Sequence, residues 1–160
     1  MALKLSSPVF QQNDSIPEQH TCDGANTAPP LEWSGAPPGA KSLVLIVDDP
    51  DAPDPKAPKQ TYVHWVVYDI PPSTKNLRAG GTALPGGARE GMNDWNRRGY
   101  GGPCPPIGRH RYFFKLYALD VVLGDLGSPE KADVEAAMQD HVLEHAELVG
   151  TYERAKVGAR

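Results

Sequence analysis

The sequence predicts a mainly β protein, an antiparallel β-sandwich with one helix near the C-terminus packed on it. Segments with the length and composition of strands follow one another without helices between them, which argues against a parallel βαβ architecture. The 16 glycines and 17 prolines among 160 residues are enough for many ordered turns. Only residues 128–148 change to a helical period.

Three segments have the composition of central strands. Residues 42–48 (SLVLIVD) are a continuous apolar run, and residues 61–70 (TYVHWVVYDI) and 110–120 (HRYFFKLYALD) are rich in β-branched and aromatic side chains. Shorter strands are predicted at residues 2–7, on a sheet edge, and at residues 31–33. Proline-rich and glycine-rich stretches separate these segments, as expected for strands that are joined by loops and turns.

One amphipathic helix is predicted over residues 128–148. A serine at its first position can cap the helix, and the proline that follows suits the first turn. Val134, Met138 and Val142 recur at a spacing of four, so we expect them to form one buried stripe against a sheet. A glycine ends this segment, and residues 151–157 are a candidate last edge strand.

The composition argues against two classes of partner. A net charge of -4 and a pI near 5.7 do not suit a general nucleic-acid binder. The longest aliphatic run, residues 43–47, is far shorter than the roughly 20 residues that cross a membrane, so no membrane insertion is expected. The N-terminus lacks the pattern of a secretory signal. We therefore expect one cytoplasmic domain over residues 1–160, with Cys22 and Cys104 as free thiols and a disulfide as the less favoured alternative.

Acidic residues follow the first central strand. The stretch VDDPDAPDPKAP, residues 47–58, carries four aspartates interleaved with four prolines. Side chains alternate between the faces of a strand, so Asp49 and Asp51 should point one way and Asp48 the other. The segment is either a solvated, stiffened loop or one wall of a site.

Histidines stand in the other two central strands. If the strand ends converge, the two acids, His64, His110 and a tyrosine would form a site. The residues predicted to share a face with each histidine are Tyr62, Val66 and Tyr68 for His64, and Tyr112, Phe114 and Leu116 for His110. Taken singly, each of these histidines is more simply explained as a core residue, and the aromatic side chains as packing.

Residues 99–112 (GYGGPCPPIGRHRY) complete this candidate site. Their first part overlaps the end of a stretch rich in glycine and proline, residues 72–107. That stretch is long for an unstructured loop unless it is functional. Glycines let backbone amides approach and hold an anion, while prolines fix the shape of the loop. Beside His64 and His110, the segment suggests a small rigid pocket for a phosphate-like group.

Metal and hydrolase chemistry are weaker alternatives. Aspartate and histidine together could bind calcium or magnesium, but the sequence has no complete calcium-binding loop, no Cys-x-x-Cys and no His-Glu-x-x-His motif. A Gly-x-Ser-x-Gly motif is also absent. Cys104 could be a nucleophile, although prolines flank it and the sequence assures it of no base. We therefore predict no metal, no cofactor and no catalytic residue.

Several motifs together resemble the phosphatidylethanolamine-binding protein family, whose animal members include the Raf kinase inhibitor protein. They are DPDAP at residues 49–53, HW at residues 64–65, and GYGGPCPPIGRHRYFFKLYALD at residues 99–120. Residues 21–33 (TCDGANTAPPLEW) and 146–154 (AELVGTYER) are similar to its bacterial and archaeal branch. The motifs occur in the expected order over essentially the whole chain.

The resemblance implies a Greek-key β-sandwich with a small preformed anion pocket. Because carboxylates repel a phosphate, we hypothesise that Asp49 orients His64 or His110 and favours its protonated form. Asp51 would meet a ligand amine or brace the loop. The ligand-binding residues that the resemblance implies are Asp49, Asp51, Pro53, His64, Gly102, Pro103, His110 and Tyr112.

The predicted function is non-enzymatic binding of a small anionic or phosphorylated ligand, such as phosphate or a phosphoethanolamine head group. The alternative is a protein-interaction module that inhibits a serine protease or a kinase through its surface. A hydrolase that uses Cys104 or the acid and histidine set is a third, less favoured hypothesis. The bacterial branch is often dimeric, so a homodimer is a further expectation.

Overall fold

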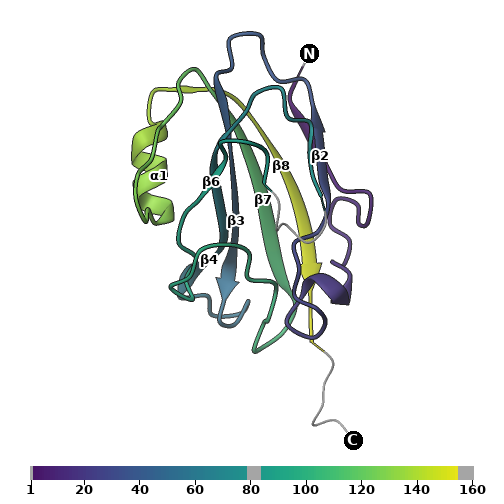
Figure 1. Ribbon diagram of the computed structural model, residues 1–160. Coiled ribbons are helices and arrows are strands. Elements are labelled where there is room, and N and C mark those ends of the chain that lie inside the picture. The colour runs from purple at the N-terminus through teal and green to yellow at the C-terminus, as the bar shows by residue number, and fades with distance from the viewer. Residues whose placement is uncertain (1, 79–83, 155–160) are drawn as a thin grey trace, which may run out of the picture.

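The computed structural model describes residues 2–78 and 84–154 and contains two antiparallel β-sheets that pack face to face. A helix covers the outer face of the larger sheet (Figure 1). The smaller sheet has the order β1-β2-β5 and consists of β1 (Lys4–Ser6), β2 (Leu31–Ser34) and β5 (Asn76–Leu77). The larger has the order β6-β4-β3-β7-β8 and consists of β3 (Ser42–Ala52), β4 (Gln60–Ile70), β6 (Arg89–Glu90), β7 (His110–Leu119) and β8 (Val142–Tyr152).

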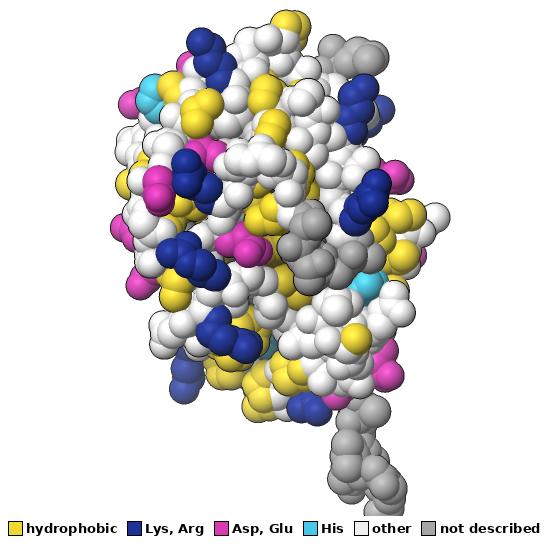
Figure 2. Space-filling view, viewed as in Figure 1, with side chains coloured by type: hydrophobic (Ala, Val, Ile, Leu, Met, Phe, Trp, Pro, Cys, Tyr) yellow, Lys and Arg dark blue, Asp and Glu magenta, His cyan; other side chains and the backbone are white. Residues whose placement is uncertain are grey.

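Two short helices complete the described elements, η1 (Glu18–His20) and α1 (Lys131–Met138). Neither is long and apolar enough to cross a membrane, and the same holds for every helix within the described ranges. The predicted antiparallel sandwich with one packed helix is confirmed. On the face shown in Figure 2, basic, acidic and apolar side chains are interspersed.

The core lies on both sides of β3. Leu43 and Leu45 belong to the main core between the two sheets, whereas Val44 and Ile46 belong to a second cluster beneath α1. All four side chains are fully buried. A strand that is covered on both faces needs apolar residues at consecutive positions, which explains the continuous apolar run of residues 42–48.

The helix prediction was wrong at both ends: the helix begins at Lys131 with Glu130, not Ser128, as its cap, and it ends at Met138. Val134 and Met138 are buried against the sheet as expected, but Val142 begins β8 and is 41% exposed. Asp140, with a φ of 69°, turns the chain between the two elements. β8 then pairs with β7 along its length, and this long-range ladder overrides the local helical spacing. The predicted strand at residues 151–157 is only the end of β8, and residues 155–157 lie outside the described part.

One substitution at two positions tests this boundary. Val134→Thr places a hydroxyl in the fully buried cluster beneath α1, and we expect it to lower the free energy of unfolding by about 1–3 kcal/mol. Val142→Thr keeps a β-branched residue on an exposed strand, so we expect a change within about 0.5 kcal/mol. Urea denaturation measures both. Equal losses at the two positions would contradict the helix end at Met138.

Candidate functional site

A pocket of roughly 260 Å³ opens at one end of the larger sheet. The antiparallel register brings the end of β3 beside the beginnings of β4 and β7, and residues 104–106 close one side. A larger groove of about 660 Å³ beside β1, β2 and β8 has no histidine or tyrosine in its lining. The lining of the smaller pocket is Asp49, Ala52, Pro53, Gln60, Tyr62, His64, Trp95, Cys104, Pro105, Pro106, His110 and Tyr112.

The structure brings most of the predicted site residues together. Asp49, Pro53, His64, His110 and Tyr112 all line this pocket, although they come from β3 and the residue after it, from β4 and from β7. The peptide bond before Pro53 is cis. The other predicted residues, Asp51, Gly102 and Pro103, stand behind the wall of the pocket and do not line it.

An irregularity in β4 turns His64 into the pocket. The register passes from Val47 opposite Trp65 to Asp48 opposite Val63, so β4 carries one extra residue at this point. His64 and Trp65 therefore lie on the same side of the sheet. The prediction that His64 shares a face with Val66 and Tyr68 was wrong, because both of these pack in the cluster beneath α1. A β-bulge of this kind shifts the alternation of side chains by one residue.

His110 and Asp49 form a buried pair. His110 Nδ1 lies 2.5 Å from Asp49 Oδ2, and its Nε2 donates to the carbonyl oxygens of Ile107 (2.9 Å) and Pro53 (3.1 Å). The other carboxylate oxygen of Asp49 accepts the Asp51 amide at 2.7 Å. Burial raises the pKa of the Asp49 carboxyl, while the hydrogen bond to His110 opposes that rise. Asp49 thus orients His110 and not His64, and neither His110 nitrogen is free for a ligand.

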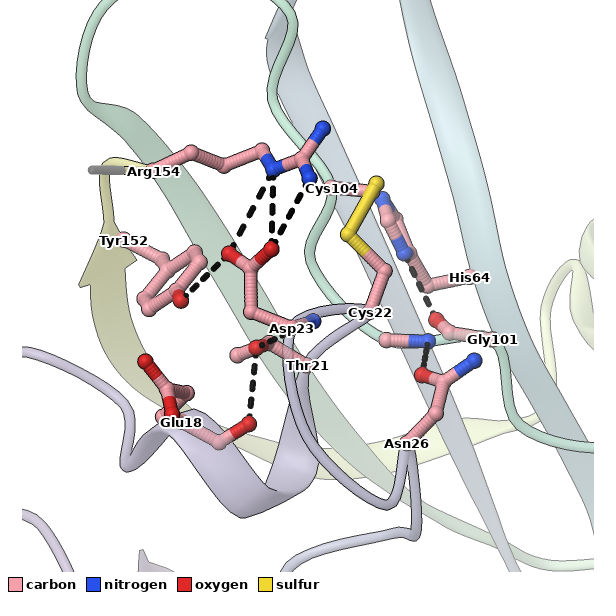
Figure 3. The surroundings of a disulfide bond; sticks show 11 residues. Glu18, Thr21, Cys22, Asp23, Asn26, His64, Gly101, Cys104, Tyr152 and Arg154 are labelled. Atoms are coloured by element: carbon pink, nitrogen blue, oxygen red, sulfur yellow. Dashed lines mark hydrogen bonds and ion pairs between the residues drawn. A yellow bond between two sulfur atoms is a disulfide. The ribbon is translucent and has the colours of Figure 1, made fainter. Parts of the chain in front are cut away.

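His64 is held in one tautomer by the backbone. Its Nδ1 donates to the carbonyl oxygen of Gly101 at 2.7 Å, as Figure 3 shows. Burial lowers the pKa of His64 to about 4, so the ring is neutral at pH 7. The hypothesis of a protonated imidazole therefore fails for His64. Its Nε2, a lone-pair acceptor in this tautomer, has no hydrogen-bond partner among the described residues.

Tyr112 presents the second available polar atom. The side chain is 1% exposed, and its hydroxyl is buried without a hydrogen-bond partner in the described part of the chain. Burial raises the pKa of Tyr112 well above its ordinary value, and the nearby Asp49 adds to this rise. The hydroxyl is therefore protonated at neutral pH and can donate a hydrogen bond. The ring packs edge-on against His64, with centroids 5.1 Å apart.

Sequence reasoning placed Tyr62 on the face of His64, as the structure does, but missed the aromatic wall that Tyr62 forms with Trp95. Their rings meet edge-on with centroids 4.9 Å apart, and Trp95 also contacts His64 at 5.1 Å. Asn93 holds the turn, because its Oδ1 accepts the Trp95 amide at 2.9 Å. A Cβ on Gly101 would lie 2.2 Å from the indole, so this position requires glycine. The only sequence signal was the unusual length of the stretch at residues 72–107.

Asp51 and Asp48 are neutralised outside the pocket. Asp51 accepts the Arg111 amide (2.9 Å) and binds its guanidinium in a bidentate pair (2.9 and 3.0 Å), which holds the pKa of Asp51 below its ordinary value. Asp51 therefore braces the loop, which is one of the two roles that the sequence analysis considered for it. Asp48 points to the opposite face, as predicted, where it accepts from Lys115 (3.1 Å) and Lys131 (2.7 Å).

A disulfide joins Cys22 to Cys104, so the expectation of two free thiols was wrong. The two residues are 82 positions apart in the sequence, and only the fold brings their Cα atoms to 5.4 Å. Gly102 is wedged beside the disulfide. Its amide donates to Asn26 Oδ1 at 2.8 Å, and a Cβ there would lie 2.3 Å from the His20 carbonyl oxygen. Gly102 thus supports the wall of the pocket from behind.

The β-sandwich and the pocket of histidine, tyrosine and buried aspartate at the end of its larger sheet can be compared with known protein families. Residues 6–153 match the family model described as phosphatidylethanolamine-binding protein. The chain belongs to this family, which confirms the resemblance of its motifs.

Relatives and solved structures agree with this assignment. The chain is 47% identical over 155 residues to a UPF0098 protein of Methanothermobacter thermautotrophicus, covering 95% of this chain and 99% of that one. A phosphatidylethanolamine-binding protein homologue from Chlamydia trachomatis has a TM-score of 0.89 at 42% identity and covers 96% and 99% of the two chains. E. coli YbcL, described as a new member of the mammalian PEBP family, has a TM-score of 0.87 at 33% identity and covers 97% of this chain and 100% of its own.

A more distant structure shares the fold alone. A carboxypeptidase Y inhibitor, solved with its cognate proteinase, has a TM-score of 0.63 at 19% identity and covers 96% of this chain and 84% of its own. This likeness shows that a proteinase inhibitor has the same fold as this chain.

The low pKa of His64 makes stability depend on pH. The folded chain takes up the proton near pH 4 and the unfolded chain near 6.5, so stability falls as the pH drops from 7 towards 4. We expect His64 to account for about 2–3 kcal/mol of this loss between pH 7 and 4.5. His64→Asn can still donate to the Gly101 carbonyl but cannot be protonated, so its unfolding should depend less on pH.

Urea denaturation at pH 7.0 and 4.5 measures this difference. The exposed His145→Asn is the matched control, and it should keep the pH dependence of the unchanged protein. An equal loss of stability in His64→Asn and in the unchanged protein would show that His64 is not held neutral by burial.

Proposed function

We propose that the chain is a non-enzymatic binding protein for a small ligand that carries an anionic or phosphorylated group, such as phosphate or a phosphoethanolamine head group. The observation that carries this proposal is the buried, unpartnered hydroxyl of Tyr112 in the lining of the pocket. Leaving a buried donor unsatisfied costs about 1–3 kcal/mol, so a group that accepts from it is expected in the pocket.

The charges of the lining indicate which form of the ligand binds. Among the described lining residues there is no lysine or arginine, His64 is neutral, and the His110–Asp49 pair carries no net charge when it shares one proton. The pocket therefore offers hydrogen bonds more than positive charge. A phosphate monoester in its monoanionic form has oxygens that can accept from Tyr112 and a P–OH group that can donate to His64 Nε2.

This arrangement favours a monoanion over a dianion. The second pKa of a phosphate monoester is about 6, so the monoanion predominates below that pH. A dianion would have to bring a proton with it to His64, whose pKa in the empty pocket is about 4. Binding should therefore strengthen as the pH falls from about 7.5 to 5.5.

The family description supports a head group with an amine. The matched family is named for phosphatidylethanolamine, and its head group combines a phosphate with an ammonium. Tyr62 and Trp95 provide ring faces and edges beside His64, and an ammonium over an aromatic face gains roughly 0.5–2 kcal/mol. In this proposal Asp51, Gly102 and Pro103 shape the wall and do not contact the ligand.

Two observations favour binding over turnover. Cys104 is engaged in a disulfide, so the oxidised chain has no thiol for the nucleophile considered from the sequence. Both nitrogens of His110 and both oxygens of Asp49 are already occupied, which leaves that pair without a free base. The distant proteinase inhibitor supports only the general capacity of this fold to bind proteins.

Removal of the Tyr112 hydroxyl tests the proposal. We expect Tyr112→Phe to weaken binding of O-phosphoethanolamine roughly 10-fold or more, since a hydrogen bond to a charged group contributes about 1.5–3 kcal/mol. Isothermal titration calorimetry at pH 5.5 and 7.5 measures the affinity, and NMR of the histidine rings locates the ligand. Tyr117→Phe, a half-buried tyrosine beside the α1 cluster, is the matched control and should bind normally.

The possible results of these measurements distinguish binding in the pocket from binding elsewhere. Saturable shifts at His64, with tighter binding at pH 5.5, agree with a monoanion in the pocket. Equal affinities for Tyr112→Phe and Tyr117→Phe would place the ligand elsewhere. If His64 and His110 do not respond to phosphate or O-phosphoethanolamine, the pocket proposal is wrong, and inhibition of a protease through the surface becomes the hypothesis to test.

A further inference from the structure

One wall of the pocket is covalently tied to a distant part of the chain. Cys104 lines the pocket together with Pro105, while Cys22 follows η1 in the N-terminal segment. Both cysteines are only partly buried. Solvent-borne reductants can therefore approach a disulfide that is also part of the proposed ligand site.

Weaker contacts cross the same junction. The Cys22 amide donates to the Pro103 carbonyl at 3.1 Å, and the Tyr100 hydroxyl donates to the His20 carbonyl at 2.7 Å. The Gly102 amide donates to the side chain of Asn26 at 2.8 Å. These are single hydrogen bonds between loops, each with a net contribution of about 0.5–1.5 kcal/mol. The disulfide is the only covalent link between the two loops in the described part of the chain.

The N-terminal side of the junction is anchored to the sheet. Asp23, the neighbour of Cys22, accepts from the Tyr152 hydroxyl at 2.7 Å and from the Arg154 guanidinium at 2.9 Å (Figure 3). Tyr152 ends β8, so the cysteine on this side has a firm support. The pocket side has no regular secondary structure from residue 99 to 109. Loss of the disulfide should therefore loosen the pocket side first.

That side of the junction also controls His64. The Gly101 amide donates to the His64 carbonyl at 3.0 Å, and the Gly101 carbonyl accepts from His64 Nδ1 at 2.7 Å. A displacement of residues 101–104 would disturb the hydrogen bond that sets the tautomer of His64. It would also move Cys104 and Pro105, which line the pocket directly. The position of residues 101–105 therefore affects both the shape of the pocket and the orientation of His64.

We infer that the Cys22–Cys104 disulfide is a redox-operated clamp on the ligand pocket, and that its reduction loosens residues 101–106 and weakens ligand binding. The binding part of this inference rests on the proposed function. A dithiol reductant breaks the S–S bond by supplying two electrons and two protons. The products are the two cysteine thiols and the disulfide of the reductant.

Thermodynamic linkage sharpens the inference. If the oxidised protein binds a ligand more tightly than the reduced protein by some factor, the ligand must favour the disulfide over the two thiols by the same factor. We expect this factor to be roughly 5- to 10-fold, at the lower end of measured couplings between sites. O-phosphoethanolamine should accordingly shift the thiol–disulfide equilibrium with dithiothreitol towards the oxidised protein.

Amide hydrogen exchange tests the loosening without any ligand. Oxidised protein and protein reduced with dithiothreitol are compared by NMR. We expect the Gly102 and Cys22 amides, whose hydrogen bonds cross the junction, to exchange at least about 10-fold faster after reduction. The Phe114 amide in the core of β7 reports global unfolding, which the loss of a disulfide also favours, so the exchange of Gly102 and Cys22 is compared with that of Phe114. Equal exchange of Gly102 and Cys22 in both states would overturn the clamp.

Titration of both redox states with O-phosphoethanolamine tests the control of binding. Weaker binding after reduction, matched by the shift of the redox equilibrium, supports the clamp. A loosened wall with unchanged affinity would overturn the claim that the disulfide controls the pocket. If neither state binds, the proposed function fails, and the exchange of Gly102 and Cys22 still decides whether the disulfide holds the wall.

Variants separate the disulfide from the weaker contacts. The double variant Cys22→Ser/Cys104→Ser should resemble the reduced protein and should not respond to dithiothreitol. Asn26→Ala removes the hydrogen bond to Gly102 and keeps the disulfide, so it should retain the response to reduction. If reduction with dithiothreitol does not change Asn26→Ala, the weaker contacts and not the disulfide hold the wall of the pocket in place. Reversible reduction of the unchanged protein gives the same answer if the double variant does not fold.

Discussion

Strand β3 is covered on both faces, and its last residues are acidic. The buried run up to Val47 lies between the smaller sheet and α1, so the carboxylates that follow enter an environment where unpaired charge is costly. The fold meets this constraint by giving each of the three acids its own partners. Asp48 binds two lysines, Asp49 binds His110, and Asp51 binds an arginine.

These pairings connect stability with the site. The Asp48 contacts attach α1 to the outer face of the sheet through Lys131, and the Asp51 contacts fix the loop after β3 to β7 through Arg111. Asp49 is left to orient His110 inside the pocket. Because every acid in this stretch of strand has its own cation or imidazole, none repels an anion without compensation. The pocket remains near neutrality and depends on directed hydrogen bonds.

Unlike the hydrogen bonds, the disulfide makes the pocket wall depend on the redox environment of the protein. Disulfides persist mainly in oxidising compartments, whereas the sequence suggested a cytoplasmic chain, and the compartment stays a prediction. In an oxidising environment the pocket wall is held permanently through Cys104. In a reducing environment the weaker contacts around Gly102 would hold it alone.

By itself the sequence determined three of the four long strands of the larger sheet and five of the residues that line the pocket. Continuous apolar and β-branched runs are local signals, and the motif residues at strand ends, such as Asp49 and His110, follow directly from those strands. Only the tertiary structure decided the end of the helix, the turn of His64 into the pocket and the disulfide. Each depends on segments far apart in the chain. β8 exists as a strand because β7 pairs with it, and the bulge at His64 depends on the register with β3. Cys22 reaches Cys104 only after two loops have packed together, and no local pattern records such pairings.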